Sequence, residues 1–359
     1  MKLLCICEPS HYNRPALEIP IFYQRVAQDK RVDFFHTSVD NVLKYENDSG
    51  KIRAVTVPAD LDYEKFLHLN SQTEIEYNLE DFNLVFCRTL KPFPTGYLDK
   101  LGNWEKFTRF VNKPTSKKQQ TRPEFLLKSS DYTPELIVTS KTEEIETFLN
   151  QHQTIVAKQN NSCGGKGIFK ISHQGDVFQV DNLLKSKQEF IDFTQVMNYI
   201  LGTSNEQIQF MQYLSGVTAG DKRIVVVDGD IYGAYIRRSQ SGNWVNNVSG
   251  DGECYLAPIS EEEKIAINNT VSHYRNLDLF TLGYDFLLDE KGVWRISEIN
   301  AGNVGGFARL EILTGKPILH QFISWLIEFA DAKKATSDFA ISQNSEYSAT
   351  GKAEGKSTL

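Results

Sequence analysis

Short apolar runs alternate with polar connectors over the first third of the chain. Three of these runs, Leu3–Ile6, Val32–Phe35 and Leu84–Cys87, have the length and the continuous apolar character of buried strands. Such strands are typical of a parallel sheet with helices between the strands. This part of the pattern therefore predicts an α/β architecture.

A boundary follows this first group of elements. A helical pattern covers Tyr97–Phe110, and Phe110–Pro114 predicts a short strand that a proline stops. We therefore expect an N-terminal α/β domain over residues 1–112.

The middle of the chain has a second pattern. A helix over Lys141–Asn150 precedes a strand over Thr154–Lys158, and the Gly-rich loop Asn160–Gly167 leads into another strand at Ile168–Ile171. Residues 173–205 are polar and weakly patterned. We expect them to form a long excursion around one helix.

Two hairpins are predicted in the last third. Asp228-Gly229-Asp230 separates the strands Lys222–Val227 and Ile231–Ile236. An Asp-Gly pair tolerates the positive φ angles of a tight turn. The second hairpin joins Gly283–Leu288 to Val293–Asn300 through the four residues between them.

Helical signals occur before and after the second hairpin. Ser260 and Glu263 have the spacing of a capping box, which opens a helix. The last predicted helix spans Ile318–Phe329. The tail over residues 332–359 is rich in Ser, Thr, Lys and Glu, so we expect it to be disordered.

The composition narrows the class of protein. Of the 359 residues, 40% are hydrophobic and 24% are charged, which is typical of a globular protein with two or three domains. The formal charge of −7 argues against non-specific binding to nucleic acid, which depends on Lys and Arg meeting phosphate. No apolar run is long enough to cross a membrane. Five scattered cysteines and no secretory signal indicate a reduced, cytoplasmic protein.

Three oxygen-bearing side chains are candidates for a metal site. Glu298 and Asn300 are two positions apart on a predicted strand, so they share one face. With a four-residue loop, Asp285 lies across from Ile296 and therefore on that same face. Two carboxylates and an amide suit Mg²⁺, which fills its other positions with water and phosphate oxygens. A solvated polar face of a hairpin is the alternative reading.

The Gly-rich loop is a candidate for phosphate binding. Lys158 ends a strand that runs into Gly164 and Gly165, whose bare backbone lets N–H groups approach phosphate oxygens. The loop is not a Walker A motif, because Lys166 is followed by Gly167 rather than by Ser or Thr. An ordinary glycine turn fits the same residues.

Two further segments carry candidate residues. Arg223 offers a planar set of donors to a phosphoryl or carboxylate group, and Asp221 can accept from ribose hydroxyls. The alternative there is a charged strand on a solvated edge. Residues 241–253 contain three Gly and three Asn, which is typical of a mobile loop. Such a loop either covers a reacting centre or lies on the surface without a role.

The order and the joint spacing of several motifs carry more information than any one of them. The most specific motif is Gly-Asp-Lys-Arg-Ile-Val-Val-Val-Asp-Gly. The segments concerned are Val85–Arg88, Phe110–Pro114, Leu214–Gly229, Leu282–Phe286 and Ser297–Asn300. Over roughly residues 80–330, the chain resembles the bacterial glutathione synthetases, which are members of the ATP-grasp superfamily.

This resemblance implies an α/β (α+β) chain with the ATP-grasp fold behind an N-terminal α/β domain. The ATP-grasp domain would span residues 113–331. Its lid subdomain would cover about residues 133–210 and its C-terminal subdomain about residues 211–331.

The resemblance also implies roles for the residues that match. The implied ligands of Mg²⁺, which Mn²⁺ could replace, are Asp285, Glu298 and Asn300. The implied contacts to ATP are Lys158, Gly164, Gly165, Gln212, Tyr213, Leu214 and Asp221. The implied catalytic residue, which stabilises the transition state of phosphoryl transfer, is Arg223. The implied substrate contacts are Arg88, Asn246 and Arg309.

The chain departs from the family pattern at two places. The spacing of a second ATP-contacting lysine falls here on Pro123, where Arg122 or Lys128 could serve instead. Arg309 comes one position later than the substrate-binding arginine of the family. The glycine-rich run before it resembles other peptide ligases of the superfamily, which leaves the substrate open.

By resemblance, the reaction is ATP-dependent ligation of a carboxylate to an amine through an acyl phosphate. The expected substrates are the small molecules γ-glutamylcysteine and glycine, which yield glutathione, ADP and phosphate. The alternatives are a related ligase with a different acid and amine, and a non-catalytic ATP-binding regulator. We expect no nucleic-acid or membrane partner, and the family is commonly oligomeric.

Overall fold

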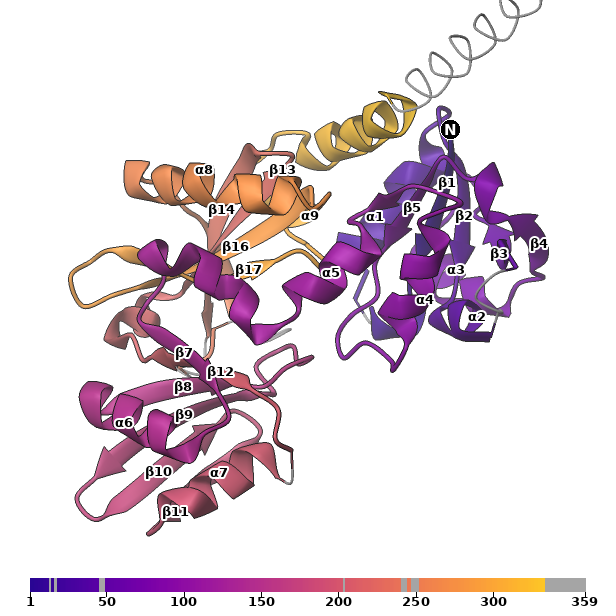
Figure 1. Cartoon of the computed structure of the whole chain (residues 1–359). Helices are drawn as coiled ribbons and strands as arrows, with labels where there is room; N and C mark the ends of the chain where they lie inside the picture. The colour runs from indigo at the N-terminus through magenta and orange to yellow at the C-terminus, as the bar shows by residue number, and fades with distance from the viewer. Residues whose placement is uncertain are drawn as a thin grey trace, which may run out of the picture.

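The described part of the chain folds around three β-sheets, shown in the computed structural model of Figure 1. The structure describes residues 1–12, 14–15, 18–44, 49–202, 204–239, 244–246 and 252–332. The predicted tail therefore lies almost entirely outside the described residues, as does most of the predicted loop at 241–253.

The first sheet has the strand order β4-β3-β2-β1-β5-β6. Its strands are β1 (Lys2–Ile6), β2 (Asp33–Thr37), β3 (Lys51–Thr56), β4 (Ile75–Asn78), β5 (Leu84–Cys87) and β6 (Phe110–Val111). Its helices are α1 (Glu18–Gln28), α2 (Val39–Lys44), α3 (Tyr63–Leu67) and α4 (Tyr97–Trp104). Strand β1 pairs in parallel with both β2 and β5, so the three predicted buried strands are confirmed.

The end of this first unit differs from the prediction in two details. Helix α4 ends at Trp104 rather than at Phe110. Pro114 does not only stop a strand, because it is the first residue of helix α5 (Pro114–Gln120). Proline is well accepted at that position, since the first residues of a helix have no intrahelical use for their N–H groups.

The second sheet has the order β11-β10-β9-β8-β12-β7 and lies at the bottom of Figure 1. Its strands are β7 (Leu136–Thr139), β8 (Thr154–Lys158), β9 (Ile168–Gln174), β10 (Val177–Asn182), β11 (Lys185–Phe190) and β12 (Ile208–Gln212). Its helices are α6 (Thr142–His152) and α7 (Phe193–Leu201). We call this unit the lid sheet.

The prediction for residues 173–205 missed two strands. This segment contains α7, as expected, but also β10 and β11. The signal was present in β10, where Phe178, Val180 and Asn182 are buried at alternate positions. That period of two is the mark of a strand with one buried face.

The third sheet has the order β15-β14-β13-β16-β17. Its strands are β13 (Asp221–Val227), β14 (Asp230–Ser239), β15 (Gly252–Leu256), β16 (Thr281–Leu288) and β17 (Trp294–Asn300). Its helices are α8 (Glu261–Arg275) and α9 (Phe307–Thr314). The predicted turn is confirmed, with positive φ at Asp228 and Gly229, and so is the capping box of Ser260 and Glu263.

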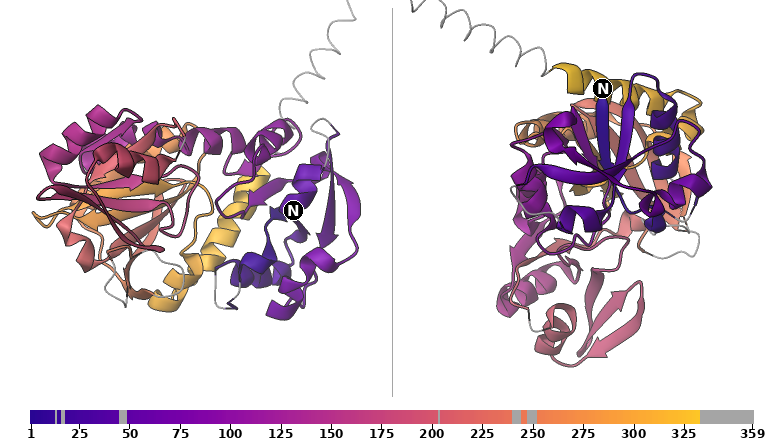
Figure 2. Two further views of the ribbon diagram at one scale, coloured as in Figure 1. Left: turned by 90° about the horizontal axis from the view of Figure 1, so that it is seen from below. Right: turned by 90° about the vertical axis from the view of Figure 1, so that its right-hand side faces the viewer.

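The last described helix connects the third sheet to the first unit. Residues 318–332 are helical and lie between these two parts of the molecule in Figures 1 and 2. The ring of Phe322 stacks on Phe307 at 3.9 Å between centroids and also contacts Phe22 and Phe86. The helix thus shares one apolar core with the N-terminal sheet. Within the described residues, no helix combines the length and apolarity that a membrane crossing requires.

Candidate functional site

The register of β16 and β17 gathers the three candidate metal ligands. The connecting loop has five residues, because Leu288 pairs with Trp294, and an irregularity adds one more residue beside Asp285. Asp285 therefore lies opposite Glu298, and the predicted pairing with Ile296 is wrong. The two one-residue shifts cancel in their effect on side-chain direction. Asp285, Glu298 and Asn300 therefore still lie on one face of the hairpin.

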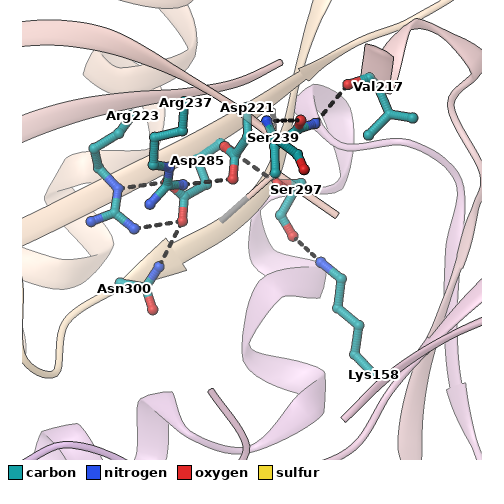
Figure 3. Close-up of polar contacts among 10 residues, drawn as sticks. Lys158, Val217, Asp221, Arg223, Arg237, Ser239, Asp285, Ser297 and Asn300 are labelled. Carbon is teal, nitrogen blue, oxygen red and sulfur yellow. Dashed lines mark hydrogen bonds and ion pairs between the residues drawn. The ribbon is translucent and has the colours of Figure 1, made fainter. Parts of the chain in front are cut away.

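Asp285 is the centre of a hydrogen-bonded network (Figure 3). Arg223 donates to it twice, from Nε to Oδ1 at 2.5 Å and from Nη2 to Oδ2 at 2.7 Å. Arg237 Nη2 donates to Oδ1 at 2.7 Å, and Asn300 Nδ2 donates to Oδ2 at 2.9 Å. Strands β13, β14, β16 and β17 thus each contribute one side chain to a single buried cluster.

The charges of this cluster oppose the effect of burial. Burial would raise the pKa of Asp285, but the guanidinium groups of Arg223 and Arg237 outweigh it and hold that pKa below its ordinary value. Burial alone would lower the pKa of Arg223, whereas the charge of Asp285 raises it. The carboxylate and both guanidinium groups therefore remain ionised.

Arg237 was missed by the sequence reasoning. It occupies the position of β14 directly across from Asp221 and donates to that carboxylate as well, from Nη2 to Oδ2 at 2.6 Å. The signal lay in the predicted hairpin, since the pairing of its two strands places Arg237 beside Asp221. Asp221 is buried, and its Oδ1 has no hydrogen-bond partner among the described residues. Burial raises the pKa of Asp221 to about 6, against the lowering effect of Arg237.

A glycine makes room for the Arg223 guanidinium. Gly283 is on β16, two residues before Asp285, and a Cβ at Gly283 would lie 2.9 Å from Arg223 Nη1. Real Cβ atoms do not approach other atoms so closely, so any side chain here would displace the guanidinium. Gly283 therefore helps to fix the position of Arg223 over Asp285.

Lys158 links the lid sheet to the same cluster. It ends β8, and its Nζ donates to the backbone oxygen of Ser297 at 2.7 Å. Burial lowers the pKa of Lys158, while the nearby charges of Glu298 and Asp285 oppose that shift. The lysine is thus held beside two carboxylates without a direct ion pair to either.

Two cavities meet at this cluster. The smaller, of about 70 Å³, is mostly apolar and lies between the lid sheet and the third sheet. The larger, of about 370 Å³, is mostly polar. Lys158, Asp285 and Glu298 line both cavities.

The predicted ATP contacts divide between the two cavities. The smaller cavity is lined by Gln212, Tyr213, Leu214 and Asp221. The larger cavity is lined by Gly164 and Gly165, together with Arg223 and Asn300. Both glycines have positive φ angles, 64° and 78°, which only glycine adopts readily. A mostly apolar cavity beside a polar one would separate a base from its phosphates.

The three predicted substrate residues are dispersed. Asn246 is buried, lines the smaller cavity and binds the backbone of Val217 and Ser239. Arg88 is buried and donates to the backbone oxygen of Val304 at 2.7 Å. Arg309 is exposed on α9 and lines neither cavity. The structure therefore does not bring these three side chains together.

The structure also distinguishes the two residues that could replace the second ATP-contacting lysine of the family. Arg122 lines the larger cavity, whereas the Nζ of Lys128 lies over the Phe125 ring, 4.6 Å from its centroid. Of the two residues considered, only Arg122 reaches the cavity in which phosphates would lie.

The donor set fits a hard divalent cation. Asp285 and Glu298 face each other, and Figure 3 shows the amide oxygen of Asn300 turned away from Asp285. Among the described residues, no group of three or more His, Cys, Asp or Glu side chains is placed to hold a metal ion, so a site here would have to use the amide of Asn300 as well. Two carboxylates and an amide match Mg²⁺, which takes few protein ligands and uses substrate phosphates for the rest.

Three solved structures share the fold of this chain, and one of them is an ATP-grasp ligase. D-cycloserine synthetase DcsG superposes with a TM-score of 0.59 at 10% identity, covering 91% of this chain and 100% of that one. The macrocyclase MdnC of Microcystis aeruginosa, bound to its precursor peptide MdnA, superposes with a TM-score of 0.58 at 12% identity, with the same coverages. The ATP-grasp ligase PsnB gives a TM-score of 0.56 at 13% identity, covering 91% of this chain and 98% of that one.

The sequence defines the family more closely. The ATP-grasp domain of prokaryotic glutathione synthetase matches residues 125–315, which is more than half of the chain. The chain belongs to this family and is an ATP-dependent ligase. It is 26% identical to a glutathione synthetase of Prochlorococcus marinus over 70% of this chain and 76% of that protein. It is 25% identical to the enzyme of Salmonella typhimurium over 71% and 75%.

Proposed function

We propose that the protein ligates a carboxylic acid to an amine by the glutathione synthetase reaction, with γ-glutamylcysteine and glycine as substrates. The observation that carries this proposal is the cluster of Arg223, Asp285 and Glu298, which lies where the smaller, apolar cavity meets the larger, polar cavity. The family and the relatives named above support the choice of substrates.

The nucleotide would span both cavities. Its base would lie in the smaller cavity against the backbone of residues 212–214, and a ribose hydroxyl would donate to the unpaired Oδ1 of Asp221. The triphosphate would enter the larger cavity, where Gly164 and Gly165 leave backbone N–H groups accessible. Lys158 and Arg223 would offset its charge.

Asp285, Glu298 and Asn300 would hold Mg²⁺. When bound, the metal neutralises charge on the phosphate oxygens during transfer. The protein's own part is electrostatic: Lys158, Arg223 and Arg237 are fixed before the reaction, so no reorganisation is needed as charge develops.

The reaction would proceed in two steps. A carboxylate oxygen of the acid attacks the γ-phosphorus of ATP, which gives an acyl phosphate and releases ADP. The amine nitrogen then attacks the acyl carbon, loses a proton and expels phosphate. The expelled phosphate keeps the carboxylate oxygen that made the first attack. Because a free carboxylate would have to expel oxide, the first step supplies a leaving group that the acid lacks.

A second candidate is ligation of a different acid and amine. Two observations favour it: Arg309 is exposed and outside both cavities, and residues 301–306 are rich in glycine. The solved structures named above extend the range of acids and amines that are worth testing.

An ADP-release assay over pairs of acids and amines separates the two candidates. We expect ADP release that requires both γ-glutamylcysteine and glycine, and mass spectrometry should detect glutathione. Glu298→Gln is the matched negative control, because it should remove turnover while the protein remains folded. No ADP with this pair, but ADP with another acid and amine, would favour the second candidate.

A further inference from the structure

Helix α5 carries a lysine for which the nucleotide site has no use. Lys117 is 1% exposed, and its Nζ has no hydrogen-bond partner among the described residues. Its aromatic neighbour is Phe93, whose ring centroid lies 5.4 Å from Nζ. An ammonium group that is buried without a partner costs free energy, so such a group requires a functional explanation.

Lys117 lies on the face of α5 that borders the larger cavity. Gln120 and Thr121 line that cavity, and they follow Lys117 by three and four residues, the spacing of one helix face. The Cε atom of Lys117 is 3.8 Å from the place that a Cβ on Gly302 would take. The next residue, Asn303, lines the cavity. Lys117 therefore stands directly behind this part of the wall.

The same part of the wall has a surplus of positive charge. Lys91 lines the cavity, and Arg88 is buried with no partner for its Nε among the described residues. Burial is the main cause of the lowered pKa of Lys117, Cys87 partly offsets it, and the charges of Arg88 and Lys91 lower it further. These three cations thus repel one another where no triphosphate is expected.

The carboxylate near Arg88 already has another role. Glu18 accepts hydrogen bonds from the backbone N–H groups of Phe307 and Ala308, at 2.9 and 3.0 Å. It therefore stabilises the first turn of α9, where a negative charge is favoured. Its charge offsets part of the charge of Arg88. No carboxylate of the described residues is among the charges that act on Lys117, so this ammonium group remains without a counter-charge.

We propose that Lys117, with Arg88 and Lys91, binds a second anionic group of the acid substrate, apart from the carboxylate that becomes phosphorylated. This rests on the proposed function, because it places the reacting carboxylate near Arg223 in the same cavity. The preferred acids then carry two negative groups, and Lys117 selects them. Lys117 is a specificity-determining residue and takes no part in the transfer of the phosphoryl group.

The test compares two probes of nearly equal shape, glutarate and its monoamide glutaramate, by thermal shift on the full chain without ATP. We expect glutarate to raise the melting temperature more than glutaramate in the wild-type protein. In Lys117→Met, this difference should vanish. The unliganded variant should be at least as stable as the wild type, because the substitution removes a buried charge that lacks a partner.

Lys118→Met is the matched control, because Lys118 is the exposed neighbour on the same helix and pairs with Asp99. It should keep the preference for glutarate. In the ADP-release assay, Lys117→Met should raise the KM for the acid about tenfold or more, with the KM for ATP unchanged.

Equal shifts for both probes in the wild type would overturn the proposal, and so would an undiminished glutarate preference in Lys117→Met. A site around Lys117 that binds only water would give one of these two results. Because the thermal shift needs no turnover, a Lys117-dependent preference for glutarate supports the proposal even if γ-glutamylcysteine proves not to be the acid.

Discussion

Arg223 and Asp285 face each other on neighbouring strands and are joined by two hydrogen bonds, of 2.5 and 2.7 Å. Asp285 also holds Arg237 and Asn300. A single carboxylate therefore fixes both guanidinium groups of the site. A metal ion held by Asp285 would have to displace some of these contacts, since the oxygens of Asp285 already accept four hydrogen bonds.

The first prediction separates stability from activity at two opposed carboxylates. Asp285→Asn should lower the free energy of unfolding by about 3–5 kcal/mol, because it leaves two buried guanidinium groups without their shared charge partner. Glu298→Gln, directly across the hairpin, should abolish turnover with little loss of stability. Denaturant unfolding and ADP release measure the two effects. If Glu298→Gln retains activity, its assignment as a metal ligand is wrong.

The second prediction concerns Gly283. In Gly283→Ala, the new Cβ would displace the guanidinium of Arg223, so kcat should fall on the order of tenfold to hundredfold. Gly305→Ala is the control, because its Cβ would meet only Glu18 at an ordinary 3.6 Å. Steady-state kinetics with circular dichroism would show whether activity is lost without the fold. Full activity of Gly283→Ala would mean that the position of Arg223 is not critical.

The third prediction concerns Trp244, which lines the smaller cavity. Its Nε1 donates to Asp181 Oδ2 at 2.9 Å, and Lys170 Nζ lies 5.2 Å from its ring centroid. Trp244 thereby links the wall of the smaller cavity to the lid sheet. Trp244→Phe removes this hydrogen bond, so it should weaken nucleotide binding about three- to tenfold in calorimetry. Trp325→Phe, in the helix beyond Ile318, should bind nucleotide normally.

The fourth prediction uses the five cysteines. Burial raises the pKa of Cys5 to about 12 and that of Cys87 to about 11, so these thiols should be inert at neutral pH. Cys163 is exposed and lines the larger cavity within the Gly-rich loop. One fast equivalent of thiol reagent should therefore react, and Mg²⁺–ATP should slow it. The fast phase should be absent from Cys163→Ser; its persistence there would contradict the assignment.

The fifth prediction concerns pH and His36. Burial lowers the pKa of His36 to about 4, although the hydrogen bond with Asn70 opposes the shift. Below pH 6.5, His36 is protonated in the unfolded chain but stays neutral in the folded chain until the pH approaches 4. The contribution of His36 to the free energy of unfolding is therefore fully present above pH 6.5. It falls by up to about 3 kcal/mol as the pH drops towards 4. Unfolding free energies in His36→Asn should lack this part of the slope, and titration of His36 near pH 6.5 in NMR spectra would refute it.

The sequence allowed the elements with strong local signals to be predicted. The apolar strands of the first unit, the Asp228-Gly229 turn and the capping box at Ser260 are all present. Residues 173–205 were harder, because β10 and β11 form one hairpin whose exposed face is polar. The alternation in β10 includes only two apolar buried residues, Phe178 and Val180, because the third buried position is Asn182.

The candidate site was likewise predicted only in part. The shared face of Asp285, Glu298 and Asn300 followed from strand periodicity, yet the pairing itself was misjudged, since neither the longer loop nor the irregularity at Asp285 has a clear signal. Arg237 was missed although the predicted hairpin places it beside Asp221. Lys117 had no such signal, because its burial and its contacts with distant segments leave no mark in the sequence.

The most direct test of the central claim follows an oxygen atom. The acid is prepared with ¹⁸O in its reacting carboxylate and incubated with Mg²⁺, ATP and the amine, and the released phosphate is analysed by mass spectrometry. An acyl-phosphate route predicts one ¹⁸O atom in each phosphate that accompanies the new amide bond. Amide formation with unlabelled phosphate would contradict it.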